Sequence, residues 1–385
     1  MKICLVSDQF SKFSSGLGTY AYQLSQSLAG AGHGITLITF DSKPFDQPFE
    51  VIRLNQLPFH QNHATWYFKS AAFAKAVHRK NKEKHFDLIH FLDARESYFF
   101  LKKKVSTSVV GTMNDDYFAS SPRDLSFYKT HYYDWFKRWA YYQWVYSLEK
   151  KCLPRLAHLI TCSNSVKNSM ARHYQISDLR MTAVYYGVSA VSGAALNVQS
   201  KQETHSIVFI GSNPQRKGLK LLLEALIKVV PHFPDLALYV VGENAAYSYF
   251  KNVVAMIPLL RARVNFLGYQ SNKEVRQLLR QSSLYVMPSI MEGFAISFLE
   301  AMLSGTPVIG GRAGSTQELI EDGKNGFLVD CRNSNQLADK IIQLFNDCSL
   351  YKQFQREGLK TASQFTPERM ASATLAVYRK MVSVS

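Results

Sequence analysis

Short runs of apolar and β-branched residues alternate with longer amphipathic stretches along most of the chain. Several of these runs are almost continuously hydrophobic, which is typical of strands buried on both faces of a parallel sheet. The amphipathic stretches 219–229 and 274–281 are typical of the helical crossovers that parallel strands need. The pattern predicts strands at 3–7, 35–40, 88–91, 109–112, 159–162 and 183–185, and again at 207–210, 238–241, 264–267, 284–287 and 307–309.

The strand–helix alternation occurs twice, and 385 residues are enough for two domains with separate cores. The stretch 187–203 is polar, rich in small residues and without periodicity, so we interpret it as the linker between them. The predicted domains are therefore 1–190 and 191–366. We expect the amphipathic segment 367–385 to form a helix that packs back on the first domain.

Composition indicates a folded protein, with 46% hydrophobic and 19% charged residues. No apolar run approaches the roughly 18–20 residues that span a bilayer, and Asp8 follows the first apolar stretch too soon for a secretory signal. The five cysteines are scattered, with no CxxC pair or Cys/His cluster, which argues against a disulfide framework and a zinc site. A cytoplasmic protein without a bound metal is the expectation.

The net charge of +16 indicates an anionic partner. Phosphate-bearing substrates, nucleic acid and an anionic membrane face all satisfy this charge, and composition does not choose among them. No nucleic-acid-binding module is recognisable, and the positive charge is spread over both halves without a dense stripe, so nucleic acid is the least favoured partner.

A first candidate for phosphate chemistry is the loop GSNPQRKG, residues 211–218, between a predicted strand and a predicted helix. Gly211 permits a tight turn, and Arg216 and Lys217 place two cations where the helix begins. The helix dipole disfavours cations there, which suggests a compensating anion such as a diphosphate. Two solvated surface charges are the alternative.

A second candidate is the stretch 288–311, in which a loop ending in Glu292-Gly293-Phe294 leads into the predicted helix 295–304. The backbone amides of residues 293–296 are expected to be free to face an anion. Glu300 lies two turns into this apolar helix, where a carboxylate needs hydroxyl or amide donors. Sugar hydroxyls would serve.

A third glycine-containing loop precedes the predicted helix that follows residue 18. Its sequence GLGTYA, with Gly16 and Gly18, superficially matches a dinucleotide-binding fingerprint. That fingerprint needs its first glycine directly after the first strand, and about eight residues intervene here. Nicotinamide binding is therefore disfavoured.

Taken in this order, the three loops resemble those of family 4 glycosyltransferases of the GT-B fold, with a glycosyltransferase group 1 domain as the C-terminal half. The most specific element is Glu292-x7-Glu300 within EGFAISFLEAMLSGTPVI, followed by GGRAGSTQELIEDGKNGFLV. The resemblance implies an α/β protein of two Rossmann-like, doubly wound parallel-sheet domains facing a central cleft. It implies retaining transfer of a hexose-type sugar from a nucleotide diphosphate to a saccharide or lipid-linked acceptor, without metal or cofactor. The pathway implied is cell-envelope polysaccharide or lipopolysaccharide synthesis, and a UDP-sugar donor is favoured over a GDP-sugar as the commoner family choice.

The resemblance also implies roles for individual residues. Glu292 would contact the donor sugar near the reacting centre, and Lys217 with Arg216 would neutralise the leaving diphosphate. Glu300 would bind the ribose, and Tyr269 falls where the base is usually read. The implied donor-binding set is Gly16, Gly18, Gly211, Ser212, Tyr269, Gly293, Phe294, Ala295, Ile296 and Glu300.

The chain departs from the family pattern at several points. Ser212 stands where an arginine is often found, and Ala295 replaces a glycine. The first half of the family often carries three histidines, of which only His90 remains, while Leu92 and Asn114 replace the others. His90 is as readily explained as a structural histidine at the end of a strand. The acceptor-side candidates are His90, Asp93, Asn114 and Asp115.

The segment 127–155 combines tryptophan and tyrosine with lysine and arginine, a composition typical of helices lying in a membrane interface. Packing within the domain and an aromatic sugar-binding wall are the alternatives. Lys102, Lys103 and Lys104 would extend such a surface or form a solvated turn. Helical spacing predicts one aromatic face made of Tyr132, Trp135, Trp139, Tyr142 and Tyr146.

Two other functions fit the same fold. One is a nucleotide-sugar epimerase of the GT-B fold, which is not expected to carry the Glu-x7-Glu pattern. The other is an inactive glycosyltransferase-like partner subunit, which the missing histidines leave open.

Overall fold

The computed structural model of the chain describes residues 1–10, 16–42, 47–55, 65–116, 132–189, 205–243 and 246–383, without the side chains of 132–135 and 137–138. The chain divides into two compact units. Unit 1 comprises Met1–Gly187 with Thr366–Ser385, and unit 2 comprises Val188–Phe365. Most of the expected linker at 187–203 lies outside the described residues.

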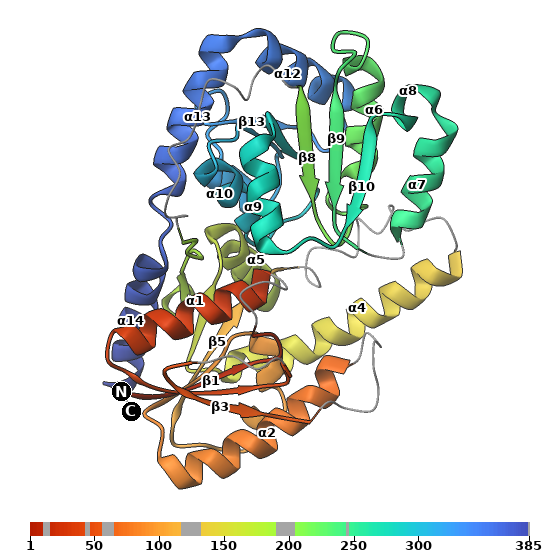
Figure 1. Ribbon diagram of the computed structural model, residues 1–385. Coiled ribbons are helices and arrows are strands. Elements are labelled where there is room, and N and C mark those ends of the chain that lie inside the picture. The colour runs from red at the N-terminus through yellow and green to blue at the C-terminus, as the bar shows by residue number, and fades with distance from the viewer. Residues whose placement is uncertain are drawn as a thin grey trace. The chain divides into compact units, whose positions relative to one another are not determined.

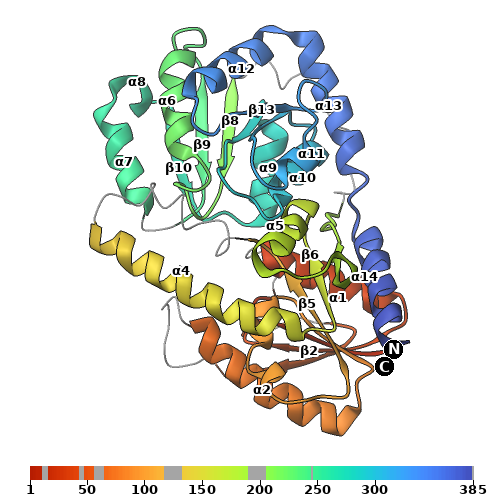
Figure 2. The ribbon, with the colours of Figure 1, turned by 180° about the vertical axis from the view of Figure 1, so that it is seen from behind.

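Unit 1 is built on a seven-stranded sheet with strand order β3-β2-β1-β4-β5-β6-β7, in which every pairing is parallel (Figure 1). Helices α1 and α14 lie on one face of this sheet and α2 lies on the other (Figures 1 and 2). The strands are β1 (Lys2–Ser7), β2 (Gly34–Thr39), β3 (Glu50–Arg53), β4 (Leu88–Phe91), β5 (Ser108–Met113), β6 (His158–Thr161) and β7 (Met181–Ala183). The α-helices are α1 (Gly16–Gly30), α2 (Thr65–Lys84), α4 (Tyr132–Cys152), α5 (Asn164–Tyr174) and α14 (Pro367–Val382), and the 3-10 turns are η1 (Ala94–Ser97), η2 (Phe100–Lys102), η5 (Leu153–Arg155) and η6 (Asp178–Arg180).

The last helix of the chain belongs to unit 1. Helix α14 begins at Pro367 with Thr366 as its N-cap, because the threonine side chain accepts a hydrogen bond from the Arg369 amide. Its buried face, which includes Leu375 and Tyr378, packs on α1, β4 and β6. The end of the chain therefore completes the core of its first unit.

Unit 2 has a six-stranded parallel sheet with the order β10-β9-β8-β11-β12-β13. Helix α6 packs on α8 and α12, and α10 packs on α9 and α13. Its strands are β8 (Ser206–Ile210), β9 (Ala237–Val241), β10 (Val264–Gly268), β11 (Leu284–Met287), β12 (Val308–Gly311) and β13 (Phe327–Val329). Its helices are α6 (Leu219–Val229), α7 (Ala246–Met256), α8 (Pro258–Arg261), α9 (Asn272–Gln281), α10 (Ile296–Leu303), α11 (Thr316–Leu319), α12 (Ser334–Asn346) and α13 (Cys348–Ala362).

The prediction missed two short edge strands and displaced a third. Strand β3 reads EVIR, with two half-buried apolar residues between exposed charged ones, which is too short to show periodicity, and β13 has only three residues. Strand β7 ends at Ala183, where the expected strand began, so that prediction was wrong by two residues. Edge strands pair on one side only, and local sequence specifies them weakly.

Among the described residues, no helix is long and apolar enough to span a bilayer. Nor does the described part of the chain bring three histidine, cysteine or carboxylate side chains together in a cluster able to hold a metal ion.

Candidate functional site

Each sheet contains a point at which the strand order reverses. In unit 2 this point lies between β8 and β11, and in unit 1 between β1 and β4. Doubly wound sheets bind ligands outside the carboxyl ends of the strands at such points, because the loops there diverge and leave a crevice. In unit 2 the two loops are 211–218 and 288–295, the two candidates that the sequence predicted.

These two loops of unit 2 pack tightly on each other. Gly218 has a φ of +83°, and a Cβ atom there would lie 2.3 Å from the carbonyl oxygen of Pro288. The backbone of Ile290 donates to the Arg216 carbonyl over 3.1 Å, and the Ser289 hydroxyl oxygen lies 3.1 Å from the same carbonyl oxygen. Glycine is therefore required at 218 for both its backbone conformation and the space.

A buried ion pair joins the two loops. Lys217 Nζ lies 2.6 Å from Glu292 Oε1, and their side chains are only 14% and 5% exposed. Arg216 lies 3.6 Å from the same oxygen and donates to the Met291 carbonyl over 2.7 Å. The Ser289 hydroxyl donates to Glu292 over 2.7 Å. The three residues predicted to act at the reacting centre are thus in mutual contact.

Electrostatics keeps this pair charged in spite of burial. Burial alone would raise the pKa of Glu292, but Lys217 and Arg216 outweigh it, and the net pKa is lowered. Burial lowers the pKa of Lys217, and the Glu292 carboxylate opposes that effect. Two cations share one carboxylate, so the cluster carries an excess positive charge. That excess suits an anionic ligand.

Helix α10 begins beside this cluster, with Ala295 as its first flanking residue. Within the described residues, the amides of Gly293 and Ala295 have no hydrogen-bond acceptor. The expectation that all four amides of 293–296 are free was wrong at Ile296, whose amide donates to the Phe294 carbonyl over 3.1 Å as the turn tightens. The helix entrance retains amide donors that can bind an anion.

Glu300 is half-buried on α10, and no described residue donates a hydrogen bond to its carboxylate. Burial raises its pKa, and Arg276 partly opposes this effect. A half-buried carboxylate without a donor can accept bonds from ligand hydroxyls. This environment is compatible with the predicted ribose contact.

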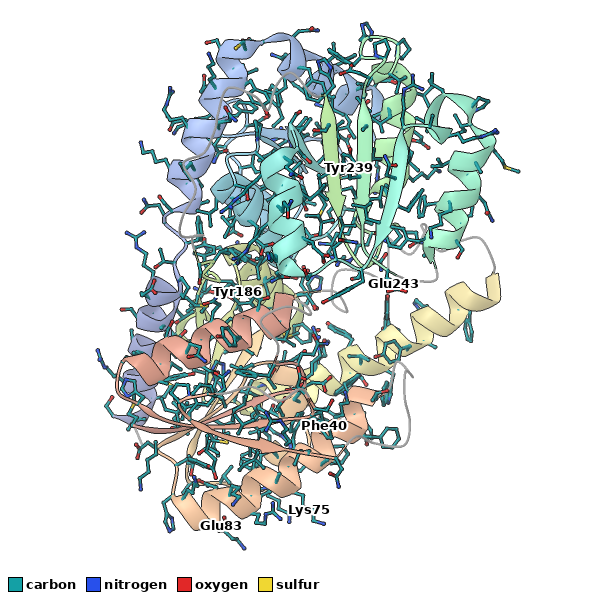
Figure 3. All side chains as sticks on the ribbon, in the orientation of Figure 1. Phe40, Lys75, Glu83, Tyr186, Tyr239 and Glu243 are labelled. Carbon is teal, nitrogen blue, oxygen red and sulfur yellow. The ribbon has the colours of Figure 1, made fainter. Side chains whose placement is uncertain are left out.

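A cavity of about 320 Å³ opens at the carboxyl ends of β9 and β10, beside the 211–218 loop. Gly211 connects the two features, since its carbonyl accepts a hydrogen bond from the Tyr247 hydroxyl. Tyr269 follows the last residue of β10 and is 56% exposed, while Ser212 is exposed at the start of the 211–218 loop. The sequence analysis missed the cavity-lining side chains, although a glycine directly after β9 was a usable signal. They are Glu243 (Figure 3), Tyr247, Ser248, Lys251 and Phe266.

In unit 1, Gly16 and Gly18 do not precede α1 but form its first and third residues, so the expected boundary was wrong. The low helix propensity of glycine favoured a loop in the sequence reading. The first turn of a helix lacks intrahelical bonds to its amides, so glycine costs less there than in the interior.

His90 lies inside the core of unit 1 and is fully buried. One ring nitrogen is 2.5 Å from the Tyr378 hydroxyl of α14, and the other is 2.7 Å from the Thr112 hydroxyl on β5. The Tyr20 hydroxyl of α1 is 3.0 Å from the same Thr112 oxygen. Burial lowers the pKa of His90 to about 3. Both ring nitrogens are used internally, which favours the structural interpretation of this histidine over an acceptor contact.

The other acceptor-side candidates gather at the carboxyl edge of the sheet around Arg95, which the sequence analysis missed. Its guanidinium pairs with Asp93 at 3.2 Å, Asp115 at 2.5 Å and Glu149 of α4 at 2.8 Å. Burial raises the pKa of Asp93 and raises that of Glu149 to about 7, although Arg95 opposes both effects. Asn114 makes different contacts within unit 1. Its side-chain nitrogen donates to the Leu92 carbonyl just after β4, and its side-chain oxygen accepts from the Tyr186 hydroxyl.

Glu96 is 4% exposed at the reversal point between β1 and β4. Its Oε1 accepts from the Asp8 amide over 3.0 Å, and within the described residues its Oε2 has no partner. Burial, reinforced by the carboxylates of Asp93 and Asp8, holds the pKa of Glu96 well above its usual range. This edge of unit 1 is therefore rich in carboxyl groups, several of them favouring the protonated form.

Comparison with solved structures identifies the fold. Sucrose-phosphate synthase from Thermosynechococcus elongatus matches with a TM-score of 0.82 at 19% identity, over 100% of both chains. HepE of Anabaena, crystallised with UDP-glucose, matches with a TM-score of 0.71 at 18% identity, again over 100% of both chains. WaaG, a glycosyltransferase involved in lipopolysaccharide biosynthesis, matches with a TM-score of 0.73 at 18% identity, over 97% of this chain and 99% of WaaG. The fold is GT-B, as the sequence predicted.

Sequence relatives cover different shares of the chain. An uncharacterised glycosyltransferase of Methanocaldococcus jannaschii is 30% identical over 174 residues, 45% of this chain and 48% of the relative. The match thus spans about half the length of that relative. Spore coat protein SA of Bacillus subtilis is 24% identical over 331 residues, 80% of this chain and 82% of that protein.

Two family models divide the chain between them. The model for glycosyltransferase family 4 matches residues 14–191, and the model for glycosyl transferases group 1 matches residues 197–361. The chain therefore belongs to glycosyltransferase family 4, with a glycosyl transferases group 1 domain in its second half.

Proposed function

We propose that this protein is a retaining glycosyltransferase that moves a hexose-type sugar from a nucleotide diphosphate to a saccharide or lipid-linked acceptor. The observation that carries the proposal is the Arg216–Lys217–Glu292 cluster at the reversal point of the unit 2 sheet, beside the amides that open α10. Two cations and helix-terminal amides favour a diphosphate, and a carboxylate among them favours a sugar hydroxyl.

A UDP-sugar is the proposed donor, and HepE, crystallised with UDP-glucose, supports this choice. The involvement of WaaG in lipopolysaccharide biosynthesis supports a role in cell-envelope polysaccharide or lipopolysaccharide synthesis. Glu300 would bind the ribose, and the cavity beside Tyr269 would accommodate the base. A cytoplasmic location at the inner face of a membrane follows if the acceptor is lipid-linked.

The donor site is tested by isothermal titration of the full chain with UDP, GDP, CMP and ADP. We expect saturable binding of UDP and a dissociation constant roughly 10- to 100-fold higher in Glu300→Ala, because a charged hydrogen-bond acceptor is lost. The matched control is Glu224→Ala, which removes a 46% exposed carboxylate from α6 in the same unit. Absence of binding by any nucleotide, or equal weakening in both variants, would overturn the donor site.

Three reaction outcomes separate the alternatives. A glycosyltransferase releases UDP from UDP-glucose only as sugar is transferred, to an acceptor or slowly to water, and a retaining enzyme gives the α-configured product by NMR. A new nucleotide sugar formed without an acceptor would identify an epimerase. Tight UDP binding with neither product would identify an inactive partner subunit.

A further inference from the structure

All four tryptophans of the chain lie on two helices of unit 1, α2 and α4. Trp139 and Trp144 are 36% and 37% exposed, and their neighbours Phe68 and Phe136 are 50% and 48% exposed. Large aromatic side chains gathered at the surface of one domain mark an interaction site, whereas single exposed ones need no explanation.

Ring contacts connect these side chains across elements distant in sequence. The Trp66 indole on α2 donates to the Tyr141 hydroxyl on α4 over 3.1 Å, and its ring centroid lies 6.0 Å from that of Trp144. The Tyr67 ring lies 5.4 Å from Trp144 and 4.8 Å from Phe99. The helices α2 and α4 and the segment 98–104 therefore form one continuous aromatic surface.

The charge on this surface has a single sign. Lys102 places its ammonium 4.8 Å and 4.2 Å from the ring centroids of Tyr98 and Phe99. Over residues 65–75, 98–104 and 136–151, every described charged side chain that is exposed is a lysine. Figure 3 shows one of them, Lys75, on the outer side of α2. We call this the aromatic–lysine surface; its exposed lysines are Lys75, Lys102, Lys103, Lys104, Lys150 and Lys151.

The structure corrects which side of α4 contributes to the surface. Tyr142 of the expected aromatic face is buried, and Tyr146 is half-buried with its hydroxyl donating to the His173 carbonyl. Trp139 of the expected face is exposed, and its ring stacks at 5.9 Å on that of Phe136, which the prediction did not include. The side chains of Tyr132 and Trp135 lie outside the described residues. Helix α4 therefore packs along one side and remains exposed along the other.

We propose that the aromatic–lysine surface docks on an anionic lipid bilayer, with its aromatic rings at headgroup depth and its lysines against lipid phosphates. Tryptophan rings favour that interface, and each nearby lysine contributes about 1 kcal/mol of attraction. The charge decides the occupant, because an uncharged saccharide or a second copy of this cationic surface would gain nothing from six exposed lysines. The proposal is independent of the Arg216–Lys217–Glu292 cluster and of Glu300, which all belong to unit 2.

The test uses vesicles of phosphatidylcholine with roughly 30% phosphatidylglycerol, compared with phosphatidylcholine alone. Because every tryptophan of the chain is on α2 or α4, intrinsic fluorescence reports the contact without a label. We expect cosedimentation with the anionic vesicles only, a blue shift of tryptophan emission, and quenching by brominated lipid. Salt at about 0.5 M is expected to reverse the binding by screening it.

Two double variants separate the charged and aromatic contributions. K102Q/K103Q is expected to lower the partition coefficient roughly 25-fold, about fivefold per charge, and F136A/W139A to reduce both binding and brominated-lipid quenching. The matched controls are K352Q/K360Q on α13, which removes two exposed lysines from unit 2, and L179A/M256A, which removes two side chains that are 82% and 81% exposed. Unchanged UDP titration and circular dichroism confirm that each variant folds.

The proposal is supported if both test variants lose binding and both controls keep it. Failure to bind anionic vesicles would overturn it, and so would equal losses in test and control variants, which would indicate general charge attraction. Tryptophan emission that responds to maltose but not to vesicles would assign the surface to sugar binding instead. A concentration-dependent dimer that buries the tryptophans would assign it to self-association.

Discussion

Replacing Glu292 by glutamine leaves Lys217 as a 14% exposed cation without its carboxylate, while the hydrogen bond from Ser289 can persist. Breaking a buried ion pair from one side typically costs about 3–5 kcal/mol. Here the cost has a ceiling, because an unpaired lysine can release its proton. With an unfolded-state pKa of about 10.4, deprotonation costs about 4 kcal/mol at about pH 7.5 and about 2 kcal/mol at about pH 9. We therefore expect the free energy of unfolding of E292Q to be about 3 kcal/mol lower than that of the wild type at the lower pH, and the loss to be smaller at the higher pH.

The assay is urea unfolding followed by two probes. Tryptophan fluorescence reports unit 1 alone, because unit 2 contains no tryptophan, whereas far-UV circular dichroism reports both units. E292Q is expected to shift only the transition that is invisible to fluorescence. The double variant K217M/E292Q removes both charges and is expected to unfold within about 1 kcal/mol of the wild type. Equal losses in E292Q and the double variant, or a shifted fluorescence transition, would refute the reasoning.

Three further changes have defined outcomes in the same assay. H90F removes the ring nitrogens that bond Tyr378 and Thr112, and only Thr112 keeps a second partner in Tyr20, so the expected cost is about 1–3 kcal/mol at neutral pH. The pKa of His90 is lowered to about 3 in the folded state, so the free energy of unfolding of the wild type falls as the pH drops below about 6.5. The difference in free energy of unfolding between the wild type and H90F should therefore narrow by up to about 1.4 kcal/mol per pH unit. The pKa of Glu149 is raised to about 7, so its stabilising protonated form is lost as the pH rises toward neutrality. Between about pH 4.5 and 7.5, the free energy of unfolding of E149Q should rise by up to about 3 kcal/mol relative to that of the wild type. G218A is expected to lose at least about 2 kcal/mol in the transition invisible to fluorescence, since a Cβ there would lie 2.3 Å from a carbonyl oxygen. A pH-independent difference for either pH-dependent variant, or a G218A protein as stable as the wild type, would contradict these assignments.

The central strands could be predicted from sequence because burial on both faces requires continuous hydrophobic runs, as in β1 and β11. The edge strands β3 and β13 do not need a continuous hydrophobic run, and with four and three residues they are too short to show a strand pattern. Helix α6 was predicted to the residue, since its leucines bury one face and Gly218 ends the preceding loop.

The candidate site was predictable where a single loop carries the chemistry and unpredictable where tertiary contacts create it. Lys217 and Glu292 were each recognised from their own loops, but their direct contact joins positions 75 residues apart and depends on β8 lying next to β11. Arg95 was missed because its three carboxylate partners come from two sheet loops and from α4. Arg95 matters because it pairs with three carboxylates at once, and no local sequence pattern shows that they meet.

The placement of α14 has a consequence for the order in which the protein is made. His90 bonds to Tyr378, 288 positions later, so the core of unit 1 stays open until α14 leaves the ribosome. Unit 2 is continuous in sequence and is complete before that helix emerges. At synthesis rates of roughly 5–20 residues per second, the first 187 residues wait on the order of 10–40 seconds for their closing helix. The second unit in the chain is thus the first that can finish folding, and a deletion of α14 would damage the unit formed by residues 1–187.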